Sequence, residues 1–194
     1  MKVSIITVCH NSAQTIADTI ASVAQQNYEN IEHIIVDGGS SDGTINIVEN
    51  SPSVHKFISE QDDGIYDAMN KGISIASGDI VGILNSDDIY AVDDAISQVV
   101  SAFSSHQVDA CYADLVYVQK NNLEKVVRYW KSRPFKYGLF KRGWMPAHPT
   151  FFVRRFYFEE LGDYDLDYRL QSDFELTMRF LEVYRINSVY LPRI

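Results

Sequence analysis

Residues 85–88 read Asn-Ser-Asp-Asp and directly follow the apolar run 81–84. Two neighbouring carboxylates repel each other by roughly 4 kcal/mol at about 4 Å where water is partly excluded, so a positive partner is expected beside them. Hard carboxylate oxygens suit Mg²⁺ or Mn²⁺, which bind through one or two carboxylates together with substrate phosphates. A helix-capping turn is the alternative, but the acids at 93–94 already precede the next helix. We therefore predict that Asp87 and Asp88 bind Mn²⁺ or Mg²⁺.

Two further polar residues lie in the last third of the chain. Asp173 falls in the first turn of a helix predicted within 171–183. An acid there can simply stabilise the helix N-terminus, or it can act as the general base for an alcohol nucleophile. His148, in the stretch PAHPT, fits a core or loop histidine, a metal ligand or an acceptor contact. The residue types leave these alternatives open.

The glycine-rich stretch DGGSSDGT occupies residues 37–44. Its glycines allow a tight turn and a close approach of the backbone to a ligand. It matches neither GxGxxG nor the P-loop pattern, so neither a dinucleotide-binding fold nor a P-loop is supported. Taken alone, it is best interpreted as a strand-to-helix turn with Ser41 or Asp42 as the cap.

The first 118 residues alternate strand and helix patterns with short connections. We expect strands at 3–8, 31–36, 54–59, 79–84 and 108–118, and helices from Ser12 to about 26, from Thr44, over 64–76 with Gly78 closing it, and from 93 or 94 to about 103. Such repeats predict right-handed crossovers and an α/β fold with a mostly parallel central sheet flanked by helices. Polar clusters at Asn11, 37–40, 62–64 and 85–88 follow successive strands, at the edge of the sheet where ligands bind.

The overall composition narrows the class of protein. The chain has 194 residues, 46% apolar and 22% charged, which predicts one domain over 1–194. The net charge of −9 argues against a nucleic-acid partner. No run approaches the ~20 apolar residues of a membrane span, and Met1 leads straight into a strand pattern, so no signal peptide is expected. Cys9 and Cys111 are expected to be reduced, buried thiols of a cytoplasmic protein.

The pattern changes after residue 119. The segment 125–144 carries seven cationic residues and no acidic one, interleaved with aromatic side chains. Cations and aromatic rings together suit an anionic membrane surface or a pyrophosphate-linked carrier, whereas the alternative is a solvated basic loop. We divide the domain at this change into a first part, 1–118, and a second part, 119–194. The latter ends in the apolar run SVYLPRI, which leaves a truncated C-terminus open.

Several of these stretches together resemble glycosyltransferase family 2, whose members are inverting enzymes of the GT-A fold, a Rossmann-like fold, that use nucleotide sugars. The resemblance rests on SIITVCHN, DGGSSDGT, EQDDGIYDAMNKGI, GDIVGILNSDDIY, AHPTFFVRR and YDLDYRLQSDFEL, in that order. These motifs cover nearly the whole chain. The most similar members are those of the bacterial surface-polysaccharide branch, such as colanic-acid-type transferases.

The resemblance implies that 1–118 is a nucleotide-sugar-binding part and 119–194 an acceptor-side part, and it assigns roles to individual residues. The nucleotide sugar would be bound by Thr7, Val8, Asn11, Asp37, Gly38, Asp62, Asn70, Lys71, Asn85 and Ser86. Thr7, Asp37 and Asp62 would contact the uridine end. Asp87 would ligate the metal with Asp88 beside it, Asp173 would be the catalytic base, and His148 and Trp144 are acceptor-side candidates. Asn85 stands where many members have an aspartate, so it would contact the ribose or a bound water.

The implied reaction moves a sugar from a nucleotide-diphosphate donor, preferably a UDP-sugar, to a saccharide hydroxyl. The acceptor would be a glycan or lipid-linked oligosaccharide of surface polysaccharide synthesis, and the enzyme cytoplasmic and peripheral on the inner face of the plasma membrane. One rival is a nucleotidyltransferase making a sugar nucleotide, which is expected to have a glycine- and arginine-rich loop where VCHNSAQ stands. The other is a non-catalytic nucleotide- or glycan-binding domain, which Asn85 keeps open.

Overall fold

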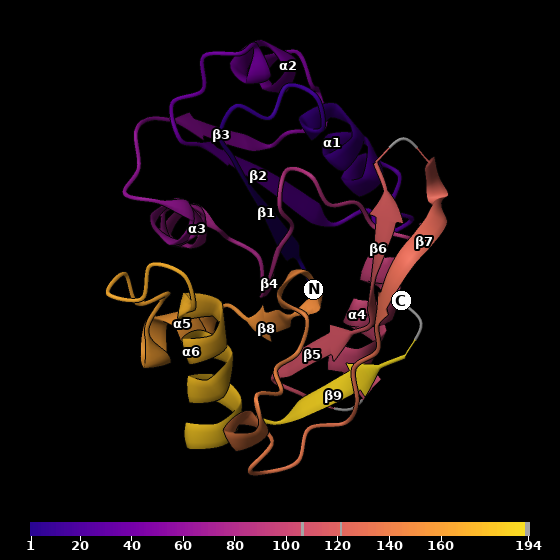
Figure 1. The fold of residues 1–194 in the computed structure, drawn as a ribbon, viewed down its shortest axis with the longest axis vertical. Helices are drawn as coiled ribbons and strands as arrows, with labels where there is room; N and C mark the ends of the chain where they lie inside the picture. The colour runs from indigo at the N-terminus through magenta and orange to yellow at the C-terminus, as the bar shows by residue number, and fades with distance from the viewer. Residues whose placement is uncertain (106, 121, 193–194) are drawn as a thin grey trace.

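The computed structural model describes residues 1–105, 107–120 and 122–192, which form a seven-stranded sheet, a separate two-stranded hairpin and surrounding helices (Figure 1). The large sheet contains β1 (Val3–Cys9), β2 (Ile31–Asp37), β3 (Lys56–Ser59), β4 (Ile80–Ile83), β5 (Ala110–Ala113), β8 (Phe152–Arg154) and β9 (Ser188–Leu191). The hairpin contains β6 (Leu115–Gln119) and β7 (Asn122–Trp130).

The sheet is mostly parallel, which confirms the predicted fold class. Its strand order is β3-β2-β1-β4-β8-β5-β9, and β8 alone among these strands runs antiparallel to its neighbours, β4 and β5. Strands β8 and β9 come from the last third of the chain, so the two predicted parts, 1–118 and 119–194, share one sheet. Because β8 pairs with β4, part 119–194 lies directly beside the strand that precedes the Asn-Ser-Asp-Asp loop.

Helices cover both faces of the sheet. One face packs against α3 (Ile65–Ile75), α5 (Phe156–Leu161) and α6 (Ser172–Met178), which continues into the π-helical turn η3 (Arg179–Val183). The other face packs against α1 (Ile16–Ala24), α2 (Thr44–Glu49) and α4 (Ala95–Ser105). The short 3₁₀ turns are η1 (Phe140–Arg142) and η2 (His148–Thr150). Strand β1 is buried along its whole length, as expected for a strand covered on both sides.

The strand predicted over 108–118 is in fact two strands in two different sheets. Strand β5 ends at Ala113 and β6 begins at Leu115. Between them, the buried Asp114 carboxylate accepts hydrogen bonds from the Ser132 amide (2.7 Å) and from the hydroxyls of Tyr129 (2.6 Å) and Tyr190 (2.7 Å). This anchor turns the chain out of the large sheet into the hairpin. A continuous apolar pattern does not reveal such a branch.

Two predicted helix boundaries are also wrong. Helix α1 begins at Ile16, and the Ser12 hydroxyl, instead of capping it, lies 2.8 Å from the Ser86 hydroxyl. Helix α3 ends at Ile75, and Gly78 does not close it. Gly78 lies against β1, where an added Cβ would stand 2.6 Å from the Ser4 amide nitrogen. Residue 78 must be glycine because two backbone segments approach each other closely there, not because the helix ends there.

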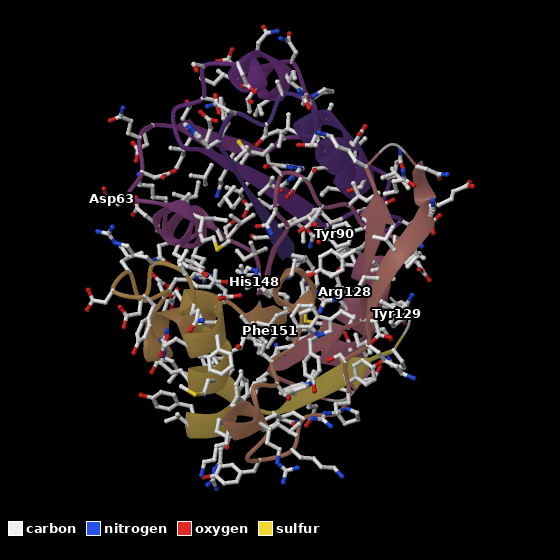
Figure 2. All side chains as sticks on the ribbon, viewed as in Figure 1. Asp63, Tyr90, Arg128, Tyr129, His148 and Phe151 are labelled. Atoms are coloured by element: carbon white, nitrogen blue, oxygen red, sulfur yellow. The ribbon has the colours of Figure 1, made fainter. Side chains whose placement is uncertain are left out.

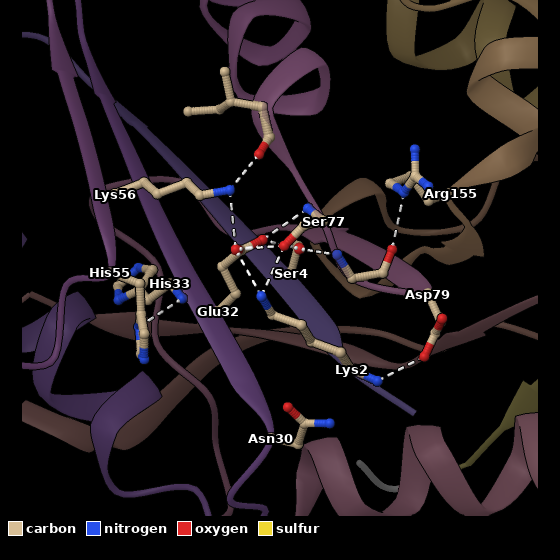
Figure 3. Close-up of polar contacts among 12 residues, drawn as sticks. Lys2, Ser4, Asn30, Glu32, His33, His55, Lys56, Ser77, Asp79 and Arg155 are labelled. Atoms are coloured by element: carbon tan, nitrogen blue, oxygen red, sulfur yellow. Dashed lines mark hydrogen bonds and ion pairs between the residues drawn. The ribbon is translucent and has the colours of Figure 1, made fainter.

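An ionic network holds the amino ends of the parallel strands (Figure 3). The buried Glu32 carboxylate accepts hydrogen bonds from Lys2 (2.8 Å), Ser4 (2.7 Å) and Ser77 (2.7 Å), and it forms an ion pair with Lys56 at 3.1 Å. Burial raises the Glu32 pKa, but these donors outweigh burial and lower it well below its usual range. The network lies at the end of the sheet opposite the polar loops.

Cys9 and Cys111 are free and buried, as predicted. Among the residues described, no helix is both long enough and apolar enough to cross a membrane.

Candidate active site

Asp37 organises the turn after β2, and groups of the protein itself already donate hydrogen bonds to its buried carboxylate. It accepts hydrogen bonds from the Gly39 amide (3.1 Å), the Ser40 amide (2.9 Å) and the Ser59 hydroxyl (2.8 Å), and also from the Ser40 hydroxyl. Burial raises the Asp37 pKa, but the bonds from Ser40 and Ser59 outweigh this effect and lower it. In this conformation Asp37 shapes the loop that carries Gly38.

The loops after β1, β2 and β3 meet at this edge. The Asp62 carboxylate lies so close to Gly38 that an added Cβ would stand 2.4 Å from its Oδ2 atom. His10 Nδ1 lies 3.1 Å from the Gly38 carbonyl oxygen. Asn11, which has a φ of 52°, accepts a hydrogen bond from the Ser41 amide at 2.9 Å. The structure therefore brings Asn11, Gly38 and Asp62 together, as strand-end placement predicts.

Four other predicted donor-site residues have structural contacts. The side chains of Thr7 and Val8 are buried, and the Thr7 hydroxyl lies 3.0 Å from His33 Nε2. Asn70 bonds the backbone of Tyr164 with both ends of its amide, at 2.8 and 2.9 Å. Lys71 donates to the Gln61 carbonyl at 2.9 Å and pairs with Glu60 and Asp67. Asn70 and Lys71 thus hold α3 to the loops around it.

The loop 85–88 emerges from β4, and its acids have unequal environments. Asp87 is exposed, whereas Asp88 is partly buried and accepts a hydrogen bond from Asn85 Nδ2 at 3.2 Å. Burial, with the nearby charge of Asp87, raises the Asp88 pKa to about 6, although the Asn85 bond opposes the rise. The other amide atom, Asn85 Oδ1, is buried and has no hydrogen-bond partner within the described ranges. The loop thus presents two neighbouring carboxylates and one buried amide oxygen without a partner among the described residues.

Asp173 lies in the first turn of α6, where the Tyr66 hydroxyl donates a hydrogen bond to its Oδ1 atom at 3.0 Å. Burial and the Asp173 charge raise the Tyr66 pKa to about 12, so this hydroxyl stays a donor. The Tyr66 ring stacks on Tyr164 at 5.5 Å, and the Tyr164 hydroxyl lies 2.7 Å from His148 Nε2. Burial lowers the His148 pKa, although the Asp173 charge opposes it, which favours a neutral imidazole.

One large cavity, about 1310 Å³, joins these two groups. Asn85, Asp87 and Asp88 line it from the β4 loop, and Tyr66, His148 and Asp173 line it from the helical side. In Figure 2, His148 lies between the α6 side of the molecule and Tyr90, which follows the acidic loop. Tyr66 and Asp173 are 107 positions apart in the sequence. The fold brings both to the cavity that Asp87 and Asp88 line.

A smaller cavity of about 440 Å³ adjoins the first at Asp87, and Asn11 and Ser86 line it. Trp144, an acceptor-side candidate, lines neither of these two cavities. Its ring packs against Tyr112 at 5.8 Å and Phe140 at 5.5 Å in the core. Asn11 and Ser86 thus share the smaller cavity with Asp87, and His148 shares the larger one, whereas Trp144 lines neither.

The acids fit a divalent cation that is shared with a ligand. Among the described residues, no three His, Cys, Asp or Glu side chains gather in a cluster that would hold a metal alone. Asp87 and Asp88 supply two carboxylates, and the orphaned Asn85 oxygen supplies a neutral acceptor. That donor set suits Mg²⁺ or Mn²⁺, which complete their coordination with water and phosphate oxygens.

Sequence reasoning did not single out Tyr66 or Tyr164. Both belong to stretches used for the resemblance, GIYDAMN and YDLDY, but a tyrosine beside a helix start has no chemical signature of its own. Only the tertiary contact to Asp173 and His148 reveals their place in the site.

Comparison with known proteins places the chain in a family. Residues 4–162 match the family described as Glycosyl transferase family 2. An uncharacterized glycosyltransferase of Mycobacterium tuberculosis (strain ATCC 25618 / H37Rv) is 33% identical over 180 residues, which cover 91% of this chain and 68% of that protein.

Solved structures share the fold. S. aureus TarS 1–349 in complex with UDP matches 100% of this chain and 59% of its own, with a TM-score of 0.77 and 20% identity. Mannosyltransferase PcManGT from Pyrobaculum calidifontis, in complex with GDP-Man and Mn²⁺, matches 99% of this chain and 55% of its own, with a TM-score of 0.74 and 21% identity. The chain thus spans less than two thirds of either, and at these identities the likeness establishes the GT-A fold alone.

Proposed function

The chain belongs to glycosyl transferase family 2, and on that premise we propose that it transfers a sugar from a nucleotide-diphosphate donor to a saccharide hydroxyl with inversion at the anomeric carbon. The observation that carries this proposal is the single cavity lined by Asp87 and Asp88 on one side and Asp173 on the other. Two acids for a metal–diphosphate and a separate acid for a proton are what such a displacement requires. A UDP-sugar is the preferred donor.

Asp87 and Asp88, with Asn85, would hold Mn²⁺ or Mg²⁺. When bound, the cation supplies Lewis-acid stabilisation of the departing diphosphate. Burial, together with the Asp87 charge, raises the Asp88 pKa, and a cation held there would favour the ionised carboxylate. The structures of TarS with UDP and of PcManGT with GDP-Man and Mn²⁺ support this part of the proposal.

Asp173 would accept the proton of the attacking hydroxyl. The acceptor oxygen forms a bond to the anomeric carbon as the bond from that carbon to the diphosphate oxygen breaks, and the nucleoside diphosphate leaves with the electron pair. Because attack comes from the face opposite the leaving group, the product anomer is inverted. Tyr66 orients the Asp173 carboxylate through its 3.0 Å hydrogen bond and leaves the second carboxylate oxygen for the acceptor.

The loops after β1, β2 and β3 would bind the nucleoside. Asn11, Gly38 and Asp62 lie together at that edge, and Asp37 keeps the turn in shape because its carboxylate is already saturated. Thr7, Val8, Asn70 and Lys71 act mainly through the backbone and loops they hold. Pre-organised loops bind a rigid nucleotide with a smaller loss of conformational entropy.

The acceptor would be a glycan or lipid-linked oligosaccharide of bacterial surface polysaccharide synthesis, reached from the cytoplasmic side of the membrane. Lys125, Arg128 and Lys131 are exposed on and beside β7, which supports contact with an anionic membrane. Phe135 and Phe140, however, pack in the core and do not reach a lipid surface. Flotation with vesicles containing anionic lipid tests this contact, and a Lys125→Ser/Arg128→Ser/Lys131→Ser variant should lose it. Unchanged flotation of the variant would remove the membrane contact from the proposal.

Nucleotide binding tests the donor site. Thermal shifts with UDP, GDP and dTDP, each with and without Mn²⁺, should show a metal-dependent stabilisation that Asp87→Asn abolishes. Glu29→Gln, which removes the same charge from an exposed residue just before β2, at the end of the sheet opposite the polar loops, is the matched control and should bind normally. Binding unaffected by Mn²⁺ and by Asp87→Asn would contradict the assignment of the acidic loop. Normal binding without any turnover of sugar would favour a non-catalytic domain of the same fold.

A further inference from the structure

The large cavity does not end at the acidic loop but continues beneath the β6–β7 hairpin. There its floor is formed by Leu84, Ala95 and Val99, which are buried. Its walls come from the loop 89–92 on one side and from the hairpin on the other. Figure 2 shows Tyr90 beside the hairpin, between that element and the centre of the molecule. We call this part of the cavity the hairpin arm.

Four large apolar side chains of the hairpin arm are exposed. The exposed fractions are 37% for Ile89, 38% for Val92, 51% for Leu123 and 51% for Val126. They belong to two separate elements, yet all four line the same cavity. Scattered exposed apolar residues are ordinary, but exposed residues that converge on one cavity indicate a ligand that covers them.

Both strands of the hairpin contribute apolar side chains to the arm. Val118 pairs with Val126, and both line the arm. Tyr117 pairs with Arg128, whose guanidinium carbon lies 5.2 Å from the Tyr117 ring centroid. Tyr117 lines the cavity as well, whereas Arg128 does not. The hairpin therefore offers the arm a surface of aliphatic and aromatic carbon.

Tyr90 adds an independent polar observation. Its hydroxyl is buried and, within the part of the chain that the structure describes, has no hydrogen-bond partner, yet the residue lines the arm. Buried hydroxyls are almost always hydrogen-bonded, so a ligand atom or a water carried with it is expected there. The arm is thus an apolar space that includes an unpaired polar group, the usual make-up of a small-molecule site.

We propose that the hairpin arm binds the hydrocarbon chain of an amphiphilic acceptor, while the sugar head of the same molecule lies at Asp173. The inference rests on the proposed function for the position of the sugar head. The chain is identified as an alkyl or prenyl group because exposed aliphatic side chains from two separate elements line the arm and because the arm is continuous with the cavity of Asp173. The acceptor is thereby a lipid-linked saccharide rather than a free one.

The test uses methyl, hexyl and octyl β-glucosides below their micelle concentrations, with affinity measured by isothermal titration calorimetry. Each methylene buried in the arm should tighten binding by up to roughly fourfold, and the heat-capacity change should become more negative with chain length. Equal affinity for methyl and octyl glucoside would overturn the proposal.

Two neighbouring valines provide a matched pair of variants. Val126 and Val127 are both exposed, at 51% and 61%, but only the former lines the cavity. Val126→Ser should weaken octyl glucoside binding about fivefold, whereas Val127→Ser should leave it unchanged. Equal effects of the two substitutions would contradict the proposed arm. Because both positions are exposed, thermal melting is expected to show that both variants fold.

The same samples separate this inference from the proposed function. If sugar transfer shows the same KM for methyl and octyl glucoside, the proposed transferase activity stands and the proposed role of the hairpin arm is contradicted. Chain-length-dependent binding without any transfer would leave the arm as an alkyl-binding site and remove the transferase assignment.

Discussion

Replacing Asp88 by asparagine should stabilise the metal-free protein while removing its affinity for a divalent cation. The folded protein raises the Asp88 pKa from 3.8 to about 6 through burial and the Asp87 charge. This rise in pKa corresponds to a free-energy difference of about 3 kcal/mol between the two protonation states, at about 1.36 kcal/mol for each tenfold change in the proton affinity. Because the shift favours the neutral form, the ionised carboxylate destabilises the folded state at neutral pH. Asparagine keeps the acceptor for the 3.2 Å bond from Asn85 and carries no charge.

The sign of the effect sets its pH window. Below pH 3.8 Asp88 is protonated in both states, so the substitution should change stability little. Between pH 3.8 and about 6 the folded state retains a proton that the unfolded chain loses, and the advantage of asparagine grows to its full value. For a chain of this length, up to about 3 kcal/mol corresponds to a rise in Tm of roughly 6–12 °C at most.

Thermal melts of wild type and Asp88→Asn at pH 4, 5.5 and 7.5, in the presence of a chelator, measure this directly. Asp63→Asn is the charge-matched control, since Asp63 lies exposed in a loop, and it should shift Tm little (Figure 2). Adding Mn²⁺ and UDP should stabilise wild type and not Asp88→Asn. A lower Tm for Asp88→Asn at pH 7.5, or a gain that does not shrink at pH 4, would refute the electrostatic reasoning.

Three other substitutions probe the site and the scaffold. Tyr66→Phe should lower kcat for transfer about tenfold by removing the donor to Asp173, with nucleotide affinity unchanged in a titration; an unchanged kcat would contradict its positioning role. Glu32→Gln should lower the free energy of unfolding, measured in urea, by roughly 2–3 kcal/mol because it breaks a buried charged network; an unchanged midpoint would contradict that network's importance. Gly78→Ala should cost roughly 1–3 kcal/mol in the same assay, since its Cβ meets the Ser4 backbone; a stabilised variant would show that the two strands separate freely.

The central sheet was predictable because its strands are buried on both faces. Such strands read as continuous apolar runs, and 3–8 and 31–36 correspond closely to β1 and β2. The position of polar loops after these strands follows from the same regularity, so the Asn-Ser-Asp-Asp loop could be placed at the ligand-binding edge without a structure.

The second half was harder to predict because its order in space differs from its order in the chain. Strand β8 has only three residues and inserts between β4 and β5, and β9 joins β5 at the edge. A three-residue strand carries too little pattern to be recognised, and Asp114, which separates β5 from β6, has no sequence signature. The hairpin arm depends on both features.

The candidate site shows the same division between local and tertiary information. Asp87 and Asp88 could be selected from their position after an apolar strand, whereas the link from Tyr66 to Asp173 joins residues 107 positions apart. The aromatic residues of 125–144 could not be sorted into buried and exposed ones from composition. Their composition suits a membrane surface, yet Trp144 packs in the core, because amphipathic and buried aromatic residues look alike in a sequence.

The sugar-transfer activity of the Asp173→Asn variant tests the central claim. The claim is that the acids on one side of the cavity bind the donor, whereas the acid on the other side removes the proton. The measurement is the rate of sugar transfer from a UDP-sugar with Mn²⁺, compared with the affinity for UDP in the same preparation. We expect Asp173→Asn to bind UDP as wild type does and to transfer at least about 100-fold more slowly. Transfer at the wild-type rate, or loss of UDP binding together with the rate, would contradict this division of roles.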